Sequence, residues 1–162
     1  MAFSSLAEID SYMKTNKCEF WEAVIREEAR DSQQPEMDIV NRMTQMYRAM
    51  KEADETYDDT LTSHSGLSGK NGKRMADYAA THKCMCGEFG GAVMARAIKM
   101  AESNACMKRI VAAPTAGSCG VVPAILITYE RMTNTSENDI IGESSVMQEV
   151  FTTINKLSNT DA

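Results

Sequence analysis

Apolar residues recur at helical spacing along most of the chain. Ser5 followed by Glu8 fits a capping box at the start of a first helix, and a second helix is predicted from about Cys18 to Ala29. Pro35 suits the first turn of a third helix, which has the clearest pattern. Its apolar positions recur at steps of three and four residues, and they are Ile39, Met43, Met46, Met50, Ala53 and Tyr57. We expect this face to pack against a neighbouring helix, as in a helical hairpin.

The helical pattern is interrupted between Tyr57 and Lys73. This stretch reads DDTLTSHSGLSGKNGK over residues 58–73, is rich in Asp, Ser, Thr and Gly, and has no apolar period, which predicts a loop. Two helices are predicted after it. The first is a short one at Arg74–Thr81, and the second is a longer one that opens at Gly87 and ends near Asn104.

A second small-residue turn reads APTAGSCG over residues 113–120. An apolar helix is predicted to follow it from Val121 to about Met132, with Pro123 in its first turn. No segment has a useful strand pattern of period two, so the sequence predicts an all-α fold with two Ser/Gly-rich loops between helices. We expect a single helical domain over residues 1–162, made of a helical hairpin region (1–57), a loop (58–73), core helices (74–132) and a tail (133–162).

Composition narrows the classes of partner and location. The 162 residues suit about one domain, and 23 acidic against 17 basic residues give a net charge of −6. Because the basic residues are scattered, we expect no nucleic-acid partner. The longest apolar run, Gly120 to Thr128, is far shorter than the ~20 residues of a membrane span, and the N-terminus lacks the pattern of a signal peptide. We therefore expect a cytoplasmic protein without a membrane partner.

The five cysteines do not form a recognisable ligand set. Their odd number, in a chain large enough to fold without staples, argues against a disulfide framework. Cys84 and Cys86 form a C-x-C pair, and no second pair or nearby histidine completes four ligands. Cys119 lies at a predicted helix N-terminus, where the helix dipole favours a thiolate, although a small buried residue at the first helical position is the better explanation. We assign no metal ligands, and Cys84, Cys86 and Cys119 stay only as candidates.

Both small-residue loops have the composition of an anion site. Backbone N–H groups at the start of a helix, with glycines that permit close approach, bind carboxylates or phosphates. The candidate residues are Ser65, Gly66 and Ser68 in the first loop and Thr115, Gly117 and Ser118 in the second. Ser118 is also the predicted N-cap of the helix that follows. Taken alone, each loop is better explained by a capped turn between helices, and only the presence of two such loops in one small domain makes an anion site as good an explanation.

The two histidines lie in different settings. His64, inside the first loop, is the candidate general base, and an exposed loop residue without a role explains it equally. His82 lies near a helix end beside Lys83, where a C-terminal capping role is expected.

A family resemblance lies in the run SNACMKRIVAAPTAGSCGVVPAIL from Ser103 to Leu126. It closely resembles the catalytic alpha subunit of the iron–sulfur-dependent L-serine dehydratases. The sequence SGLSG at residues 65–69 is similar to that family's Ser-Gly-Leu-x-Gly-Gly segment, with Lys70 in place of the second glycine. The resemblance covers about residues 6–132.

The resemblance implies an all-helical lyase that converts L-serine to pyruvate and ammonia without pyridoxal phosphate. It implies a [4Fe–4S] cluster in which one iron lacks a protein ligand and acts as a Lewis acid on the serine hydroxyl. The substrate-binding residues that it implies are Ser65, Gly66, Ser68, Thr115, Gly117 and Ser118. The partners that it implies are L-serine and either a regulatory beta subunit or further copies of the chain.

The chain departs from the family's pattern at the cluster. The family's cluster cysteines lie in a Gly-Gly-Cys-Gln segment and in a Cys-Asp-Pro segment followed by Val-Pro-Cys, and neither motif occurs here. We therefore expect the N-terminal portion of a catalytic subunit, inactive alone, that carries the substrate loops without the cluster ligands. Two alternatives stay open: a fragment of a cysteine desulfidase-like lyase, and a non-catalytic helical module that binds a partner through exposed apolar surface.

Overall fold

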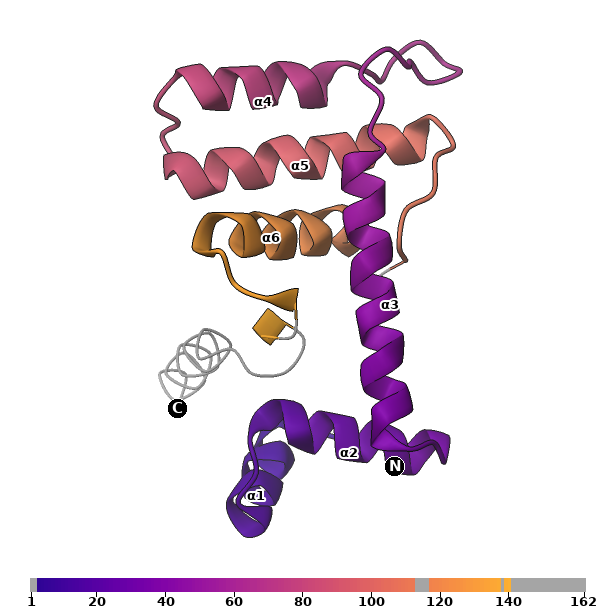
Figure 1. Ribbon diagram of the computed structural model, residues 1–162, viewed down its shortest axis with the longest axis vertical. Coiled ribbons are helices and arrows are strands. Elements are labelled where there is room, and N and C mark those ends of the chain that lie inside the picture. Colours follow the sequence, from indigo (N-terminus) through magenta and orange to yellow (C-terminus); the bar gives the residue numbers. More distant parts are fainter. Residues whose placement is uncertain (1–2, 113–116, 138, 141–162) are drawn as a thin grey trace. The chain divides into compact units, whose positions relative to one another are not determined.

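The computed structural model of the chain describes residues 3–112, 117–137 and 139–140 (Figure 1). All of the regular structure in these residues is helical and none is strand, which confirms the predicted all-α fold. The helices are α1 (Leu6–Asn16), α2 (Phe20–Ser32), α3 (Glu36–Glu55), α4 (Asn71–Thr81), α5 (Gly87–Ala105) and α6 (Ser118–Thr133). The chain divides into two compact units, one holding residues 1–43 and the other Thr44–Thr135. The single domain stays a prediction.

The first unit begins with the predicted helix cap. The Ser5 hydroxyl accepts a hydrogen bond from the Glu8 amide at 3.2 Å, and the Glu8 carboxylate accepts the Ser4 amide at 2.8 Å. The reciprocal half of the capping box thus reaches one residue further back than predicted. The next helix, α2, begins at Phe20 rather than Cys18, because its first turn is tied by the Glu19 amide donating to the Glu22 carboxylate at 2.8 Å.

The apolar face of α3 is only partly the predicted one. Ile39, Met50 and Ala53 are buried, whereas Met43 and Met46 are 42% and 41% exposed, so the prediction is wrong at these two methionines. Tyr47 is buried instead, with 3% of its surface exposed. The buried stripe is rotated by one residue at this point because the Tyr47 hydroxyl reaches a carboxylate on α6.

In the second unit, α5 packs against both α4 and α6 and lies between them in Figure 1. Met100 on α5 and Pro123, Ile127 and Thr128 on α6 are fully buried. Because α6 begins at Ser118, three residues before the predicted start, Pro123 lies inside the helix rather than in its first turn. Its ring nitrogen carries no hydrogen and cannot donate to the carbonyl of Cys119.

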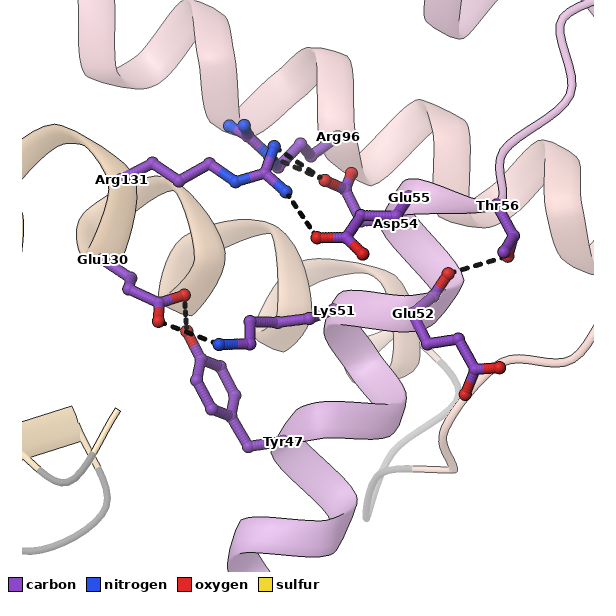
Figure 2. Close-up of polar contacts among 9 residues, drawn as sticks. All are labelled: Tyr47, Lys51, Glu52, Asp54, Glu55, Thr56, Arg96, Glu130 and Arg131. Atoms are coloured by element: carbon purple, nitrogen blue, oxygen red, sulfur yellow. Dashed lines mark hydrogen bonds and ion pairs between the residues drawn. The ribbon is translucent and has the colours of Figure 1, made fainter. Parts of the chain in front are cut away.

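The C-terminal half of α3 is tied to α5 and α6 by charged side chains (Figure 2). One carboxylate oxygen of Asp54, Oδ2, lies 3.4 Å from Nε of Arg96 and 3.3 Å from Nη1 of Arg131. A second group joins Glu130 on α6 to Tyr47 at 2.8 Å and to Lys51 at 3.0 Å. These contacts hold the end of α3, from which the first small-residue loop departs.

One carboxylate oxygen of Asp54 is not satisfied by these contacts. Within the described residues, Oδ1 of Asp54 is buried and has no hydrogen-bond partner. The Asp54 side chain is only 4% exposed, so its charge depends on the two arginines.

None of the helices in the described part of the chain is both long and apolar enough to cross a membrane.

Candidate functional site

The first small-residue loop is closed by its own hydrogen bonds. The Ser63 amide donates to the carbonyl of Ser68 at 2.8 Å, and the Ser68 amide donates to the Ser63 hydroxyl at 3.1 Å. Inside this closure, the Gly66 amide donates to the carbonyl of Ser63 at 2.8 Å. Ser63 is buried and is the residue that the loop folds around. From the sequence, Ser63 is one of the small donors of this loop but is not among the predicted substrate-binding residues.

The tip of this loop is open to solvent. His64, Ser65, Gly66 and Leu67 are all exposed, whereas Ser68 is half-buried. The Ser65 hydroxyl lies 3.1 Å from the Ser63 hydroxyl and accepts the Leu67 amide at 3.4 Å. The loop therefore presents a hydroxyl that is held in place from behind, together with exposed backbone, which is a suitable surface for a small polar ligand.

Backbone geometry explains the glycine pattern of the loop. Gly69 has a φ of +150°, and a side chain there would lie 2.5 Å from the carbonyl oxygen of Leu61, so the two legs of the loop cross closely at this point. Lys70 follows with a φ of +68°, in the left-handed region that favours glycine. This is the position where the resembled segment has its second glycine.

The second small-residue loop is described only at its end. Gly117 is the N-cap of α6 and Ser118 is its first helical residue, so the predicted N-cap role of Ser118 is wrong by one position. Gly117 is exposed, and both Ser118 and Cys119 are half-buried. The predicted ligand residue Thr115 lies outside the described residues.

Both loops enter their helices beside the same segment of α5. At the start of α4, a side chain on Gly72 would lie 2.6 Å from Cγ of Lys99. At the start of α6, a side chain on Gly120 would lie 3.5 Å from the carbonyl oxygen of Ala97. The structure thus brings the ends of the two predicted loops to the C-terminal part of α5, one on each neighbouring helix.

A buried carboxylate at this place was missed by the sequence analysis. Glu102 on α5 is only 3% exposed. It accepts the Asn71 amide on Oε1 at 2.8 Å, the Gly72 amide on Oε2 at 2.9 Å and the Tyr57 hydroxyl on Oε2 at 2.7 Å. The predicted helix at Arg74 begins three residues earlier, at Asn71, because this distant side chain satisfies its first amides.

These contacts set the ionisation of both side chains. Burial alone would raise the pKa of Glu102, but the hydrogen bonds from Tyr57, Gly72 and Asn71 outweigh it and hold that pKa below its ordinary value of 4.5. Burial and the hydrogen bond to Glu102 raise the pKa of Tyr57 to about 12. At neutral pH the pair is therefore a carboxylate that accepts from a neutral phenol.

A small pocket opens between the first leg of the loop and the end of α5. Its volume is about 210 Å³, part of which is open to solvent. The residues that line it are Tyr57, Asp58, Leu61, Glu102, Ser103, Cys106 and Lys108. The pocket thus lies where the base of the loop contacts the end of α5.

The described cysteines do not fit an iron–sulfur cluster. Such clusters are held by converging Cys thiolates. In residues 3–112, 117–137 and 139–140, no group of three Cys, His, Asp or Glu side chains lies close enough to hold a metal ion. Cys84 and Cys86 instead lie beside the glycines of α5, since a side chain on Gly91 or Gly90 would lie 2.7 Å or 2.9 Å from their sulfur atoms.

The remaining predicted position is His82. It is the C-cap of α4, as predicted, and its ring stacks on Tyr78 with the centroids 4.4 Å apart. Its Nδ1 lies 2.8 Å from the Thr81 hydroxyl. His82 therefore completes the end of α4 that is opposite the loop.

The described residues form an all-helical protein in which α4 and α6, the helices that follow the two small-residue loops, both begin beside the same part of α5. Comparison with known proteins gives the family. The model of the family described as serine dehydratase alpha chain matches residues 15–154, and the chain belongs to this family. The resemblance found in the sequence is thereby confirmed.

Two curated relatives agree with this assignment. The L-serine dehydratase alpha chain of Peptoniphilus asaccharolyticus is 36% identical over 110 residues, which cover 66% of this chain and 37% of the relative. The probable L-serine dehydratase alpha chain of Bacillus subtilis (strain 168) is 27% identical over 139 residues, which cover 86% of this chain and 46% of the relative. The chain thus spans less than half the length of each of these relatives. No solved structure matches it significantly.

Proposed function

We propose that this chain serves in the conversion of L-serine to pyruvate and ammonia, and that its part is to bind and orient L-serine on the small-residue loops. Membership of the serine dehydratase alpha chain family supports the reaction, as do the names of the two relatives. The observation that carries the binding role is the closed Ser63–Ser68 loop, because it fixes the exposed Ser65 hydroxyl from behind.

The hydrogen bonds of the loop suit a carboxylate ligand. The Ser68 amide donates to the Ser63 hydroxyl, which can then donate its own proton to the Ser65 hydroxyl. Ser65 also accepts from the Leu67 amide, so its remaining proton is directed to an outside acceptor. Such a chain of hydrogen bonds strengthens its last donor, and the substrate carboxylate is the acceptor that we assign to it. Gly66, Ser68, Thr115, Gly117 and Ser118 stay proposed as further substrate contacts.

The proton chemistry of the reaction requires a base near this ligand. Loss of the α-proton and of the β-hydroxyl from serine gives aminoacrylate, which tautomerises to an imine and is hydrolysed to pyruvate and ammonia. His64 is next to Ser65 and exposed, and we assign the removal of the α-proton to it. The proposed cofactor, a [4Fe–4S] cluster, has no ligand set among the described residues, so this chain's own steps are binding, orientation and proton removal.

The names of the relatives also bear on assembly and location. Both are called alpha chains, and we assign this chain a second subunit or further copies of itself as partner. We place the reaction in the cytoplasm.

Calorimetric titration of the chain with L-serine tests the binding role. Removal of the Ser65 hydroxyl by Ser65→Ala is expected to weaken binding by about 10-fold, the effect of one hydrogen bond to a charged group. The control is Ser11→Ala, which removes an exposed hydroxyl from α1 that is bonded only to the carbonyl of Ala7. Equal affinity of the Ser65→Ala variant and the wild type, or no binding by the wild type, would contradict the proposal.

A further inference from the structure

The loop that carries Ser65 has both of its ends attached to one side chain of another helix. Tyr57 lies just before the loop and Asn71 and Gly72 lie just after it, and all three donate to the Glu102 carboxylate. A chain of thirteen residues, 58–70, is therefore closed at its base by a single buried group.

The start of α4 supplies no substitute for this carboxylate. The N-cap residue of α4 is Lys70, which makes no side-chain cap hydrogen bond, and the first turn of α4 contains no acidic residue. Because the first amides of a helix need acceptors and its N-terminus favours negative charge, Glu102 supplies from α5 what the local sequence lacks. Hydrogen bonds to an ionised acceptor are also about twice as strong as neutral ones.

The surroundings of Glu102 are shaped to hold the two ends close. Gly72 allows α4 to approach α5 closely, since a side chain at this position would collide with Lys99. The Lys99 ammonium in turn lies 5.4 Å from the centre of the Tyr57 ring, on the same helix as Glu102. Tyr57 is thus held by two residues of α5, one that contacts its ring and one that accepts its hydroxyl.

The loop is also closed by contacts of its own above this base. Its tip is closed by the Ser63–Ser68 hydrogen bonds and its legs cross where Gly69 approaches Leu61. A unit closed in this way changes its position mainly at its base. The orientation of the Ser65 hydroxyl therefore depends on the contacts at residues 57, 71 and 72.

We infer that Glu102 is a positioning residue, which sets the affinity of the loop for L-serine without touching the ligand. The inference rests on the proposed function for its ligand, and on the contacts of Glu102 alone for its mechanism. Closing the loop at its base before the ligand arrives removes part of the ordering cost of binding.

The variant that tests this is Glu102→Gln. An amide has one acceptor oxygen and one donor group, so at least one of the three donors at the base would face another donor. Hydrogen exchange at residues 57–72 is expected to accelerate by about 10-fold, while exchange in α2 stays unchanged. The Kd for L-serine is expected to rise by about 10-fold.

Two further variants separate positioning from folding. Tyr57→Phe removes one donor and leaves both backbone amides bonded to Glu102. It is expected to raise the exchange rate at residues 57–72 and the Kd for L-serine by less than Glu102→Gln does. It is also expected to fold, even where Glu102→Gln fails to. Glu88→Gln makes the same chemical change at an exposed position of α5 and is expected to alter neither readout. A merely structural role would accelerate exchange across the whole second unit rather than in residues 57–72.

The two readouts also separate this inference from the proposed function. Faster exchange at residues 57–72 with an unchanged Kd would overturn the positioning role and leave the L-serine site standing. Unchanged exchange in both the Glu102 and Tyr57 variants would overturn the inference outright. A wild-type chain that does not bind L-serine would overturn the proposed function and the affinity claim together, while the exchange comparison would still decide whether Glu102 holds the loop.

Discussion

Replacing Gly72 by alanine would test the close approach of α4 to α5 on which the loop's base depends. A Cβ at this position would lie 2.6 Å from Cγ of Lys99 and 3.0 Å from its backbone Cα and N. Rotation of the Lys99 side chain can move Cγ but leaves the 3.0 Å contacts with the backbone Cα and N, so the two helices must move apart. Such overpacking costs about 1–3 kcal/mol, and the better helix propensity of alanine recovers at most about 1 kcal/mol. We expect a net loss of about 1–2 kcal/mol.

The matched control is Gly120→Ala in the first turn of α6. There a Cβ would lie 3.5 Å from the carbonyl oxygen of Ala97 and 3.8 Å from Cβ of Met100, which are ordinary contact distances. The same substitution should therefore stabilise the protein by about 0.5–1 kcal/mol. The two variants carry the same chemical change in the first turns of two helices and are expected to differ in sign.

Thermal unfolding followed by far-ultraviolet circular dichroism measures both variants against the wild type. The expected change in Tm is a fall of about 2–8 °C for Gly72→Ala and a small rise for Gly120→Ala. The Gly72 variant should also exchange the Asn71 amide faster, because a displaced α4 no longer reaches Glu102. A Gly72→Ala protein as stable as Gly120→Ala would refute the close approach, and with it the reason why α4 begins where it does.

Two other predictions concern buried charge. Asp54→Asn is expected to lower the free energy of unfolding by about 2–3 kcal/mol, because Arg96 is left largely buried without its counter-charge. Glu55→Gln, at an exposed partner of Arg131, should change it by less than about 0.5 kcal/mol. Equal effects of the two substitutions in urea unfolding would contradict the role assigned to the Asp54 contacts. The lowered pKa of Glu102 adds stability that is complete above its ordinary value of 4.5 and is lost as the pH falls through the lower folded value. The stability advantage of the wild type over Glu102→Gln should therefore shrink between about pH 6 and pH 3, and a constant difference would contradict the assignment.

The sequence predicted what depends on neighbouring residues. The cap of α1 by Ser5 could be predicted because serine is a preferred N-cap residue and its partner, Glu8, is only three residues away. The Ser/Gly stretch after Tyr57 could be predicted as a loop for the same reason, since it has no apolar period. These features depend on local sequence, and in the structure they lie close to their predicted positions.

What could not be predicted depends on residues far apart in the chain. Glu102 looked like one more polar residue of an amphipathic helix, yet it caps a helix that begins thirty-one residues earlier. The only sequence signal was the lack of a local cap: Lys70 and the first turn of α4 provide no acceptor for the first amides of the helix. Likewise Tyr47 replaces Met46 in the buried stripe of α3 because its hydroxyl finds Glu130, eighty-three residues away.

The most direct test of the account is a hydrogen-exchange map of the chain with and without L-serine. The account predicts slower exchange at residues 63–69 and at the start of α6, with no change in α1 and α2. Glycine, which shares the carboxylate but lacks the hydroxyl, should give the same map at higher concentration. Protection by L-serine confined to other segments, with residues 63–69 unchanged, would contradict the claim that this loop is the substrate site.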